Sequence, residues 1–115
     1  MRVVIYGRSH RNDARLVSQM EKMRSYCINR NYNVVREVTD CCSGSHTGDN
    51  MIGLLNDPIK DFEAIVICAP SRISRNMVMM VETVKMMRAK GIRLIVTDMP
   101  ELNNMNSKSP VQKVS

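Results

Sequence analysis

Residues 64–76 read AIVICAPSRISRN, and this stretch decides the fold. It opens with the most apolar run in the chain, which predicts a strand that is buried on both faces. A long helical pattern follows from Met77 onward, so Arg72 and Arg75 are predicted to lie in the loop between the strand and a helix. In an open parallel sheet, ligands bind outside the carboxyl ends of the strands, where such loops meet.

A second junction of this kind lies near the start of the chain. Residues 3–6 read VVIY and predict another buried strand, and residues 7–11 read GRSHR and predict the loop that follows it. If both loops lie at one edge of a sheet, Arg8, Arg72 and Arg75 converge on a pocket that also holds serine hydroxyl groups. The planar fork of arginine matches phosphate oxygens, so the pattern indicates a phosphodiester site.

Strand-like and helical patterns alternate along the chain, which predicts a three-layer α/β fold with a mostly parallel sheet and helices on both faces. Right-handed crossovers and a central third strand favour the spatial order 2-1-3-4. The first and third strands are then neighbours, and the loops after them open into one crevice. The expected strands lie near residues 2–7, 32–38, 63–69 and 92–96, and the expected helices near 13–30, 51–57 and 76–90.

The sequence also predicts which surfaces of two of these elements are buried. The second strand carries Arg36 and Glu37 between its valines, which indicates an edge position with some exposure. The last helix is expected to begin at Asn76, to end at Gly91 and to bury one apolar face. The residues predicted to share this face are Met77, Met80, Val81, Val84 and Met87.

The composition limits the partners and the cofactors. A formal net charge of +6 favours a polyanion such as nucleic acid as the partner. The cysteines are Cys27, Cys41, Cys42 and Cys68, and they form no C-x-x-C pair, so no metal site is predicted. No other cofactor is expected. We interpret them as reduced thiols of a cytoplasmic protein, with Cys27 and Cys68 in the core. The apolar runs are too short for a membrane span, and no signal peptide is recognised.

The predicted pocket has the groups needed for phosphoryl transfer. Clustered arginines would bind a phosphodiester and stabilise the extra negative charge of a pentavalent transition state. A hydroxyl group beside them could attack the phosphorus and form a covalent intermediate. Ser9 is the first candidate, and Ser43, Ser71 and Ser74 are the others. His10 is interpreted as an exposed loop residue, because no neighbour in the sequence orients its ring.

Together these stretches resemble the catalytic domain of the serine recombinases, the resolvase/invertase family. The likeness covers residues 2–98. The motifs that support it are residues 5–9 (IYGRS), Gln19, Asp40, residues 43–44, residues 72–75 (RISR) and residues 91–95 (GIRLI). The resemblance implies DNA recombination, in which a serine attacks a DNA phosphodiester and forms a 5′-phosphoserine link with a free 3′-hydroxyl, without metal or ATP. It also implies an origin in a mobile element or an integration system.

The same resemblance assigns roles to residues of this chain. Ser9 would be the nucleophile, and the arginines would hold and activate the scissile phosphate. The implied catalytic group is Ser9, Arg8, Arg72 and Arg75, and the implied supporting, phosphate-binding group is Gln19, Ser43 and Ser71.

The chain departs from the family pattern at three places. The family has Tyr-x-Arg-x-Ser with a Gln eleven residues after the Arg, and Arg8 and Gln19 keep that interval. An ungapped register therefore puts His10 at the nucleophile position and Ser9 one residue earlier, which leaves the choice between them open. The arginine that normally follows residues 43–44 is absent, and Ser71 replaces the usual aspartate before Arg72.

Two other functions remain open at this point. The chain could be a catalytically impaired resolvase-like protein that acts as a DNA-associated regulator or assembly partner. It could also be a phosphate- or nucleotide-binding α/β module, although it lacks both a G-x-G-x-x-G motif and a Walker-type loop.

The resemblance also divides the chain and describes its partners. We expect a resolvase-like catalytic domain over residues 1–101 and a flexible C-terminal tail over residues 102–115. The long dimerisation helix and the DNA-binding region of family members are not recognised in the sequence. The domain alone is therefore expected to bind DNA weakly, through phosphates, and to form a homo-oligomer in a full-length context.

Overall fold

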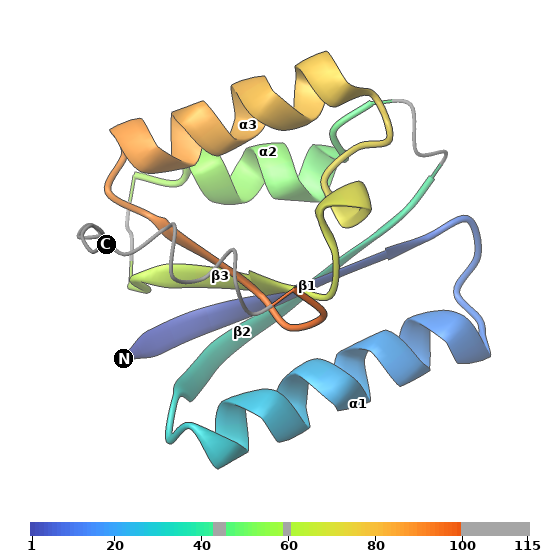
Figure 1. Ribbon diagram of the computed structural model, residues 1–115, viewed down its shortest axis with the longest axis vertical. Helices are drawn as coiled ribbons and strands as arrows, with labels where there is room; N and C mark the ends of the chain where they lie inside the picture. The colour runs from blue at the N-terminus through green and yellow to red at the C-terminus, as the bar shows by residue number, and fades with distance from the viewer. Residues whose placement is uncertain (43–45, 59–60, 100–115) are drawn as a thin grey trace.

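A computed structural model describes residues 1–42, 46–58 and 61–99, which form a parallel sheet with helices on both faces (Figure 1). Its four strands are β1 (Arg2–Ser9), β2 (Asn33–Cys41), β3 (Ala64–Ile67) and β4 (Arg93–Val96). Their order is β2-β1-β3-β4, and each neighbouring pair runs parallel. The predicted order 2-1-3-4 and the edge position of the second strand are confirmed.

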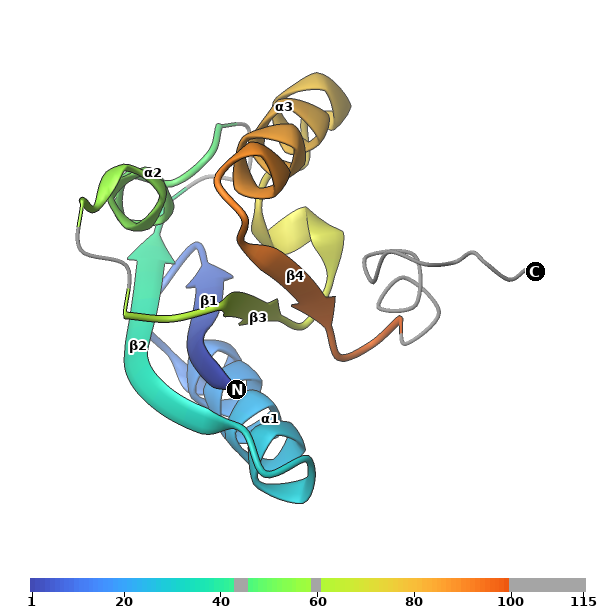
Figure 2. The same cartoon turned by 90° about the vertical axis from the view of Figure 1, so that its left-hand side faces the viewer.

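The helices divide between the two faces of the sheet. Helix α1 (Ala14–Asn29) covers one face, and α2 (Asp49–Asn56) and α3 (Met77–Ala89) lie together on the other (Figures 1 and 2). A short 3₁₀ turn, η1 (Pro70–Arg72), connects β3 to the start of α3. The predicted three-layer α/β arrangement is confirmed. No helix in the described ranges is long and apolar enough to cross a membrane.

Strand β1 supplies side chains to the core on both sides of the sheet. Val4 and Tyr6 are fully buried in the cluster beneath α2 and α3, and Val3 and Ile5 are fully buried in the cluster beneath α1. This alternation follows from the two-residue period of a strand. Cys27 and Cys68 are buried in the cluster beneath α1, as predicted.

The helix ends follow from local side-chain chemistry. The Asp13 carboxylate accepts a hydrogen bond from the backbone N–H of Arg15, and the Asn76 side chain accepts from the N–H groups of Val78 and Met79. Both are N-caps, which satisfy donors that the first helical turn leaves unpaired. After α3, Gly91 adopts a φ of 75°, the left-handed conformation that commonly ends a helix.

Strand β1 is longer than the sequence predicted. Arg8 and Ser9 were expected in the loop after Gly7, but they continue the strand and pair with Asp40 and Cys41 of β2. The reason is that β2 also extends further than predicted, to Cys41, and its ladder carries β1 past the glycine. The last residues of β1 therefore keep the strict alternation of a strand.

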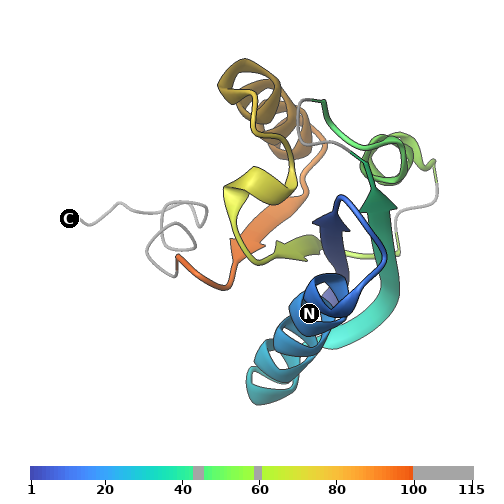
Figure 3. The same cartoon turned by 90° about the vertical axis from the view of Figure 1, so that its right-hand side faces the viewer.

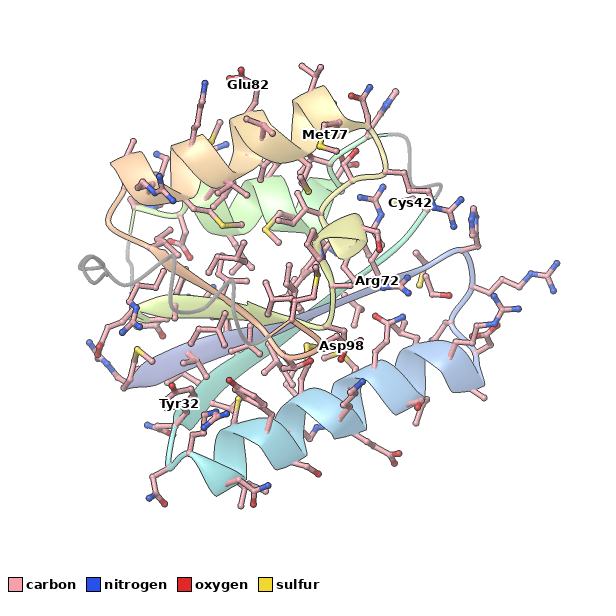
Figure 4. The ribbon with its side chains drawn as sticks, viewed as in Figure 1. Tyr32, Cys42, Arg72, Met77, Glu82 and Asp98 are labelled. Carbon is pink, nitrogen blue, oxygen red and sulfur yellow. The ribbon has the colours of Figure 1, made fainter. Side chains whose placement is uncertain are left out.

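The buried face of α3 also differs from the prediction. Met87 is buried and Met80 and Val84 pack against the core, as predicted. Met77 is 69% exposed and Val81 is 39% exposed, against the prediction, and Thr83 is buried although it was not predicted to be. Thr83 can be buried because its hydroxyl donates a hydrogen bond to the carbonyl of Met79 and shares another with Thr47. The apolar pattern alone could not include a threonine in the core, so it placed the buried stripe too far to one side. Figure 4 shows Met77 at the outer start of the helix.

Alanine substitutions at two glycines should change the stability of the chain in opposite directions. Gly53 lies within α2, where a methyl group added to its Cα would meet no atom within 4 Å, whereas Gly91 has a positive φ. We expect Gly53→Ala to raise the free energy of unfolding by about 0.5–1 kcal/mol, because alanine is the better helix former. We expect Gly91→Ala to lower it by about 1–2 kcal/mol, because a Cβ is strained at that φ. Urea denaturation measures both changes, and a shift of the same sign in the two variants would contradict the backbone described here.

Candidate functional site

A pocket of about 530 Å³ opens at the carboxyl edge of the sheet. Ser9 and His10 line it from the end of β1, and Arg72 and Arg75 line it from the segment after β3. Figure 3 views the molecule from this edge. The structure thus brings both predicted loops to one crevice, although they are far apart in the sequence.

Helix α1 forms the opposite wall of the pocket. The lining residues from α1 are Ala14, Arg15, Ser18, Gln19 and Lys22, and the remaining ones are Cys68 and Asp98. The Lys22 ammonium lies 2.5 Å from an Asp98 carboxylate oxygen, and this hydrogen bond raises the pKa of Lys22. Figure 4 shows Asp98 on the side of the sheet toward α1, and Arg72 beside the last part of β1. The pocket is therefore rich in basic groups, with one carboxylate that is already paired.

The side chain of Gln19 joins the two walls. Its Oε1 accepts a hydrogen bond from the Arg8 backbone N–H at 3.1 Å, and its Nε2 donates to the Arg8 carbonyl at 2.9 Å. The same carbonyl accepts a hydrogen bond from Nη1 of Arg72 at 3.1 Å. Gln19, predicted as a supporting residue, thereby fixes the end of β1 against α1, and Arg72 fixes it against η1.

The side chain of Arg8 does not line this pocket. Only 3% of Arg8 is exposed, and its Nη1 donates to the carbonyl of Ile73 at 2.6 Å. Arg8 lies on the face of β1 that carries Tyr6, whereas Ser9 is one residue further and so belongs to the face toward α1. Arg72 and Arg75 reach the pocket, and Arg8 lies behind it and holds the segment that carries them.

The remaining candidates lie in several places. Ser71 is exposed and does not line the pocket, and Ser74 is buried, where its hydroxyl accepts a hydrogen bond from the N–H of Asn76. Ser43 lies outside the described residues. Cys41 and Cys42 are exposed, and the described part of the chain contains no group of three His, Cys, Asp or Glu side chains that could hold a metal ion.

A buried polar cluster on the other face of the sheet was missed by the sequence analysis. The Tyr6 hydroxyl donates to an Asp40 carboxylate oxygen at 2.5 Å, and the two oxygens accept from the N–H groups of Asn50 and Met51 at 3.1 and 3.2 Å. These donors form the first turn of α2, which favours a negative charge. Burial and the hydrogen bond to Asp40 raise the pKa of Tyr6 well above its ordinary value. The signal in the sequence was a tyrosine directly after the aliphatic residues 3–5, because a buried tyrosine hydroxyl needs a hydrogen-bond partner.

Gly48 completes this cluster. A methyl group on its Cα would lie 2.1 Å from an Asp40 carboxylate oxygen and 2.8 Å from the Tyr6 hydroxyl oxygen. Real atoms do not approach so closely, so this position requires glycine. The backbone at Gly48 therefore packs directly against the side chains of Asp40 and Tyr6.

The comparisons with known proteins agree with this geometry. The family described as "Resolvase, N terminal domain" matches residues 3–114. No curated protein sequence matches the chain.

Several solved structures share the fold. The N-terminal catalytic domain of TP901-1 integrase is 23% identical with a TM-score of 0.77, over 87% of this chain and 79% of that one. A resolvase family site-specific recombinase from Streptococcus pneumoniae is 20% identical with a TM-score of 0.71, over 87% and 74% of the two chains. The C-terminal catalytic domain of IS1535 TnpA, an IS607-like serine recombinase, is 25% identical with a TM-score of 0.68, over 90% and 81%.

The cluster around Asp40 yields a test of its contribution to stability. Tyr6→Phe removes the buried hydroxyl that donates to Asp40, and we expect the free energy of unfolding to fall by about 1.5–3 kcal/mol, the range for hydrogen bonds to charged groups. Tyr32→Phe is the matched control, because Tyr32 is only half-buried and its hydroxyl has no such acceptor among the described residues. We expect it to change stability by less than about 0.5 kcal/mol. Equal effects of the two substitutions in chemical denaturation would contradict this role of Tyr6.

Proposed function

Because the chain belongs to the family of resolvase N-terminal domains, we propose that it cleaves and rejoins DNA as the catalytic domain of a serine recombinase. One observation carries the proposal: the Ser9 side chain lines the same pocket as Arg72 and Arg75. A hydroxyl beside two guanidinium groups is suited to attack on a phosphodiester.

The chemistry follows from these groups. The Ser9 hydroxyl oxygen attacks the phosphorus of a DNA phosphodiester and loses its proton. The bond between the phosphorus and the 3′-oxygen breaks, and that oxygen leaves as a 3′-hydroxyl. A 3′-hydroxyl later attacks the 5′-phosphoserine and releases Ser9. Arg72 and Arg75 stabilise the additional negative charge that the pentavalent transition state carries in both directions.

The environment of Arg72 supports a role in holding the phosphate. Its Nη1 is held by the Arg8 carbonyl, and its Nε is buried with no hydrogen-bond partner in the described residues. A buried donor without a partner is costly, and a bound phosphate oxygen would satisfy it. Arg75 is exposed at the mouth of the pocket. In this proposal Arg8 and Gln19 are positioning residues that hold the backbone on which these groups depend.

We assign the nucleophile to Ser9 and not to His10. Ser9 is half-buried, pairs with Cys41 in the sheet, and its carbonyl accepts a hydrogen bond from the Cys42 N–H at 3.1 Å. Its backbone is therefore fixed by the sheet, and the alternation of the strand puts its side chain on the face toward α1. His10 is exposed beyond the end of the strand, although it lines the same pocket.

DNA is the proposed partner, bound mainly through its phosphates, so its affinity should fall steeply as salt rises. We also propose that the resolvase-like domain covers residues 1–101 with a tail at 102–115, and that the full-length protein forms a homo-oligomer in the cytoplasm. Ser43 remains a proposed phosphate-binding residue, whereas Ser71 lies outside the pocket and is given no such role.

The assignment of the nucleophile can be tested without knowledge of the target site. Thymidine 5′-(p-nitrophenyl phosphate) carries a good leaving group in place of the 3′-oxygen. We expect the chain to release p-nitrophenolate and to gain the mass of one thymidylyl group, and peptide mapping should locate that group on Ser9. The ester should be stable in acid, as a phosphoserine link is.

Three variants complete the experiment. Ser9→Ala should abolish the adduct, and Arg72→Ala should slow its formation by about 100-fold or more, the range for loss of one group that stabilises the transition state. Arg88→Ala removes the same charge from the exposed side of α3 and should have no effect. An acid-labile adduct on His10 would contradict the assignment of Ser9. No adduct on any residue would favour the catalytically impaired relative.

A further inference from the structure

We propose that the α1 wall of the pocket binds a second phosphate of the cleaved DNA strand, adjacent to the scissile one. This inference rests on the proposed function, since Arg72 and Arg75 are taken to hold the scissile phosphate. The additional site consists of Arg15 and Ser18, and Lys22 borders it.

The position of these residues follows from helical spacing. Residues three and four apart lie on one side of a helix, so Arg15, Ser18 and Lys22 form a continuous stripe along α1. All three line the pocket that also contains Arg72 and Arg75. The pocket thus has basic groups on two walls. A single phosphate bound beside η1 would leave the basic groups on the α1 wall without an anion.

The balance of charge points in the same direction. The pocket is lined by four lysine and arginine side chains, Arg15, Lys22, Arg72 and Arg75, and by one carboxylate, Asp98. Lys22 and Asp98 neutralise each other as an ion pair. Arg72 and Arg75 match the two negative charges of the pentavalent phosphorus. Arg15 then remains, and no carboxylate in the described part of the chain pairs with it.

Arg24 and Arg36 are neutralised by carboxylates in a way that Arg15 is not. Arg24, also on α1, forms a two-point ion pair with Glu37, and Arg36 pairs with Asp57 and Asp61. Arg15 lines the pocket together with Ser18. Arginine and serine side chains are among the groups that commonly contact DNA phosphates. A neighbouring phosphate of the same strand is the anion that must be present whenever the scissile one is bound.

Short deoxythymidine oligomers separate the two phosphate sites. The dinucleotide dTpdT has one phosphodiester, and the trinucleotide dTpdTpdT has two in succession. Their dissociation constants can be measured by NMR titration of the ¹⁵N-labelled chain. We expect dTpdTpdT to bind about two- to fivefold more tightly than dTpdT, the range for an additional exposed ion pair.

Variants assign that gain to α1. Arg15→Ala should bring the two affinities together and leave the affinity for dTpdT unchanged. Arg88→Ala is the matched control, because it removes an equal charge on the opposite face of the sheet, and it should preserve the gain. A gain that persists in Arg15→Ala, or one lost equally in Arg88→Ala, would overturn the second site.

The outcome is independent of the cleavage chemistry. Arg72→Ala should weaken the binding of both oligomers, because it acts on the phosphate that they share. If the gain depends on Arg15 but no thymidylyl adduct forms on Ser9, the second phosphate site stands and the assigned nucleophile fails. If the adduct forms but the gain does not depend on Arg15, the recombinase chemistry stands and the second site is wrong.

Discussion

The pair of hydrogen bonds between the Gln19 amide and the backbone of Arg8 is the contact on which the site depends. It satisfies the N–H and the carbonyl of one residue at the end of β1 with one side chain from α1. Arg72 adds a hydrogen bond to the same carbonyl from 64 residues further along the chain, so β1, α1 and η1 meet at one residue. Because partly buried polar groups are costly when unpaired, these segments are held at fixed distances from one another. The pocket lies between them.

The alternation of β1 distributes its polar residues between two sides of the sheet. Ser9 is directed to the pocket beside α1, whereas Arg8 and Tyr6 are directed to the other face, where they hold Ile73 and Asp40. Separating either of these buried pairs would leave a polar group unpaired in a low dielectric, which is costly. The face of the sheet toward α2 and α3 is therefore a rigid support for the pocket. It fixes the segment that carries Arg72 and Arg75 and the start of α2, and its side chains do not line the pocket.

Much of this arrangement could be predicted from the sequence. The apolar run before Arg72 located the central strand, and the alternation of elements gave the strand order and the edge at which the arginines meet. The sequence could not predict on which face of the sheet the Arg8 side chain lies. That depends on whether β1 ends at Gly7, and only the pairing of β1 with β2 decides where β1 ends. The burial of Thr83 and the requirement for glycine at position 48 depend on contacts between distant segments, which leave no periodic signal.

The proposed chemistry requires that Ser9 face a phosphate held by Arg72 and Arg75. The most direct measurement is a crystal structure of the chain soaked in phosphate, inspected at this pocket. We expect an anion bound to both guanidinium groups, with the hydroxyl oxygen of Ser9 directed at its central atom. An anion contacted by the ring of His10, with Ser9 turned away from it, would contradict the assignment of the nucleophile and with it the proposed chemistry.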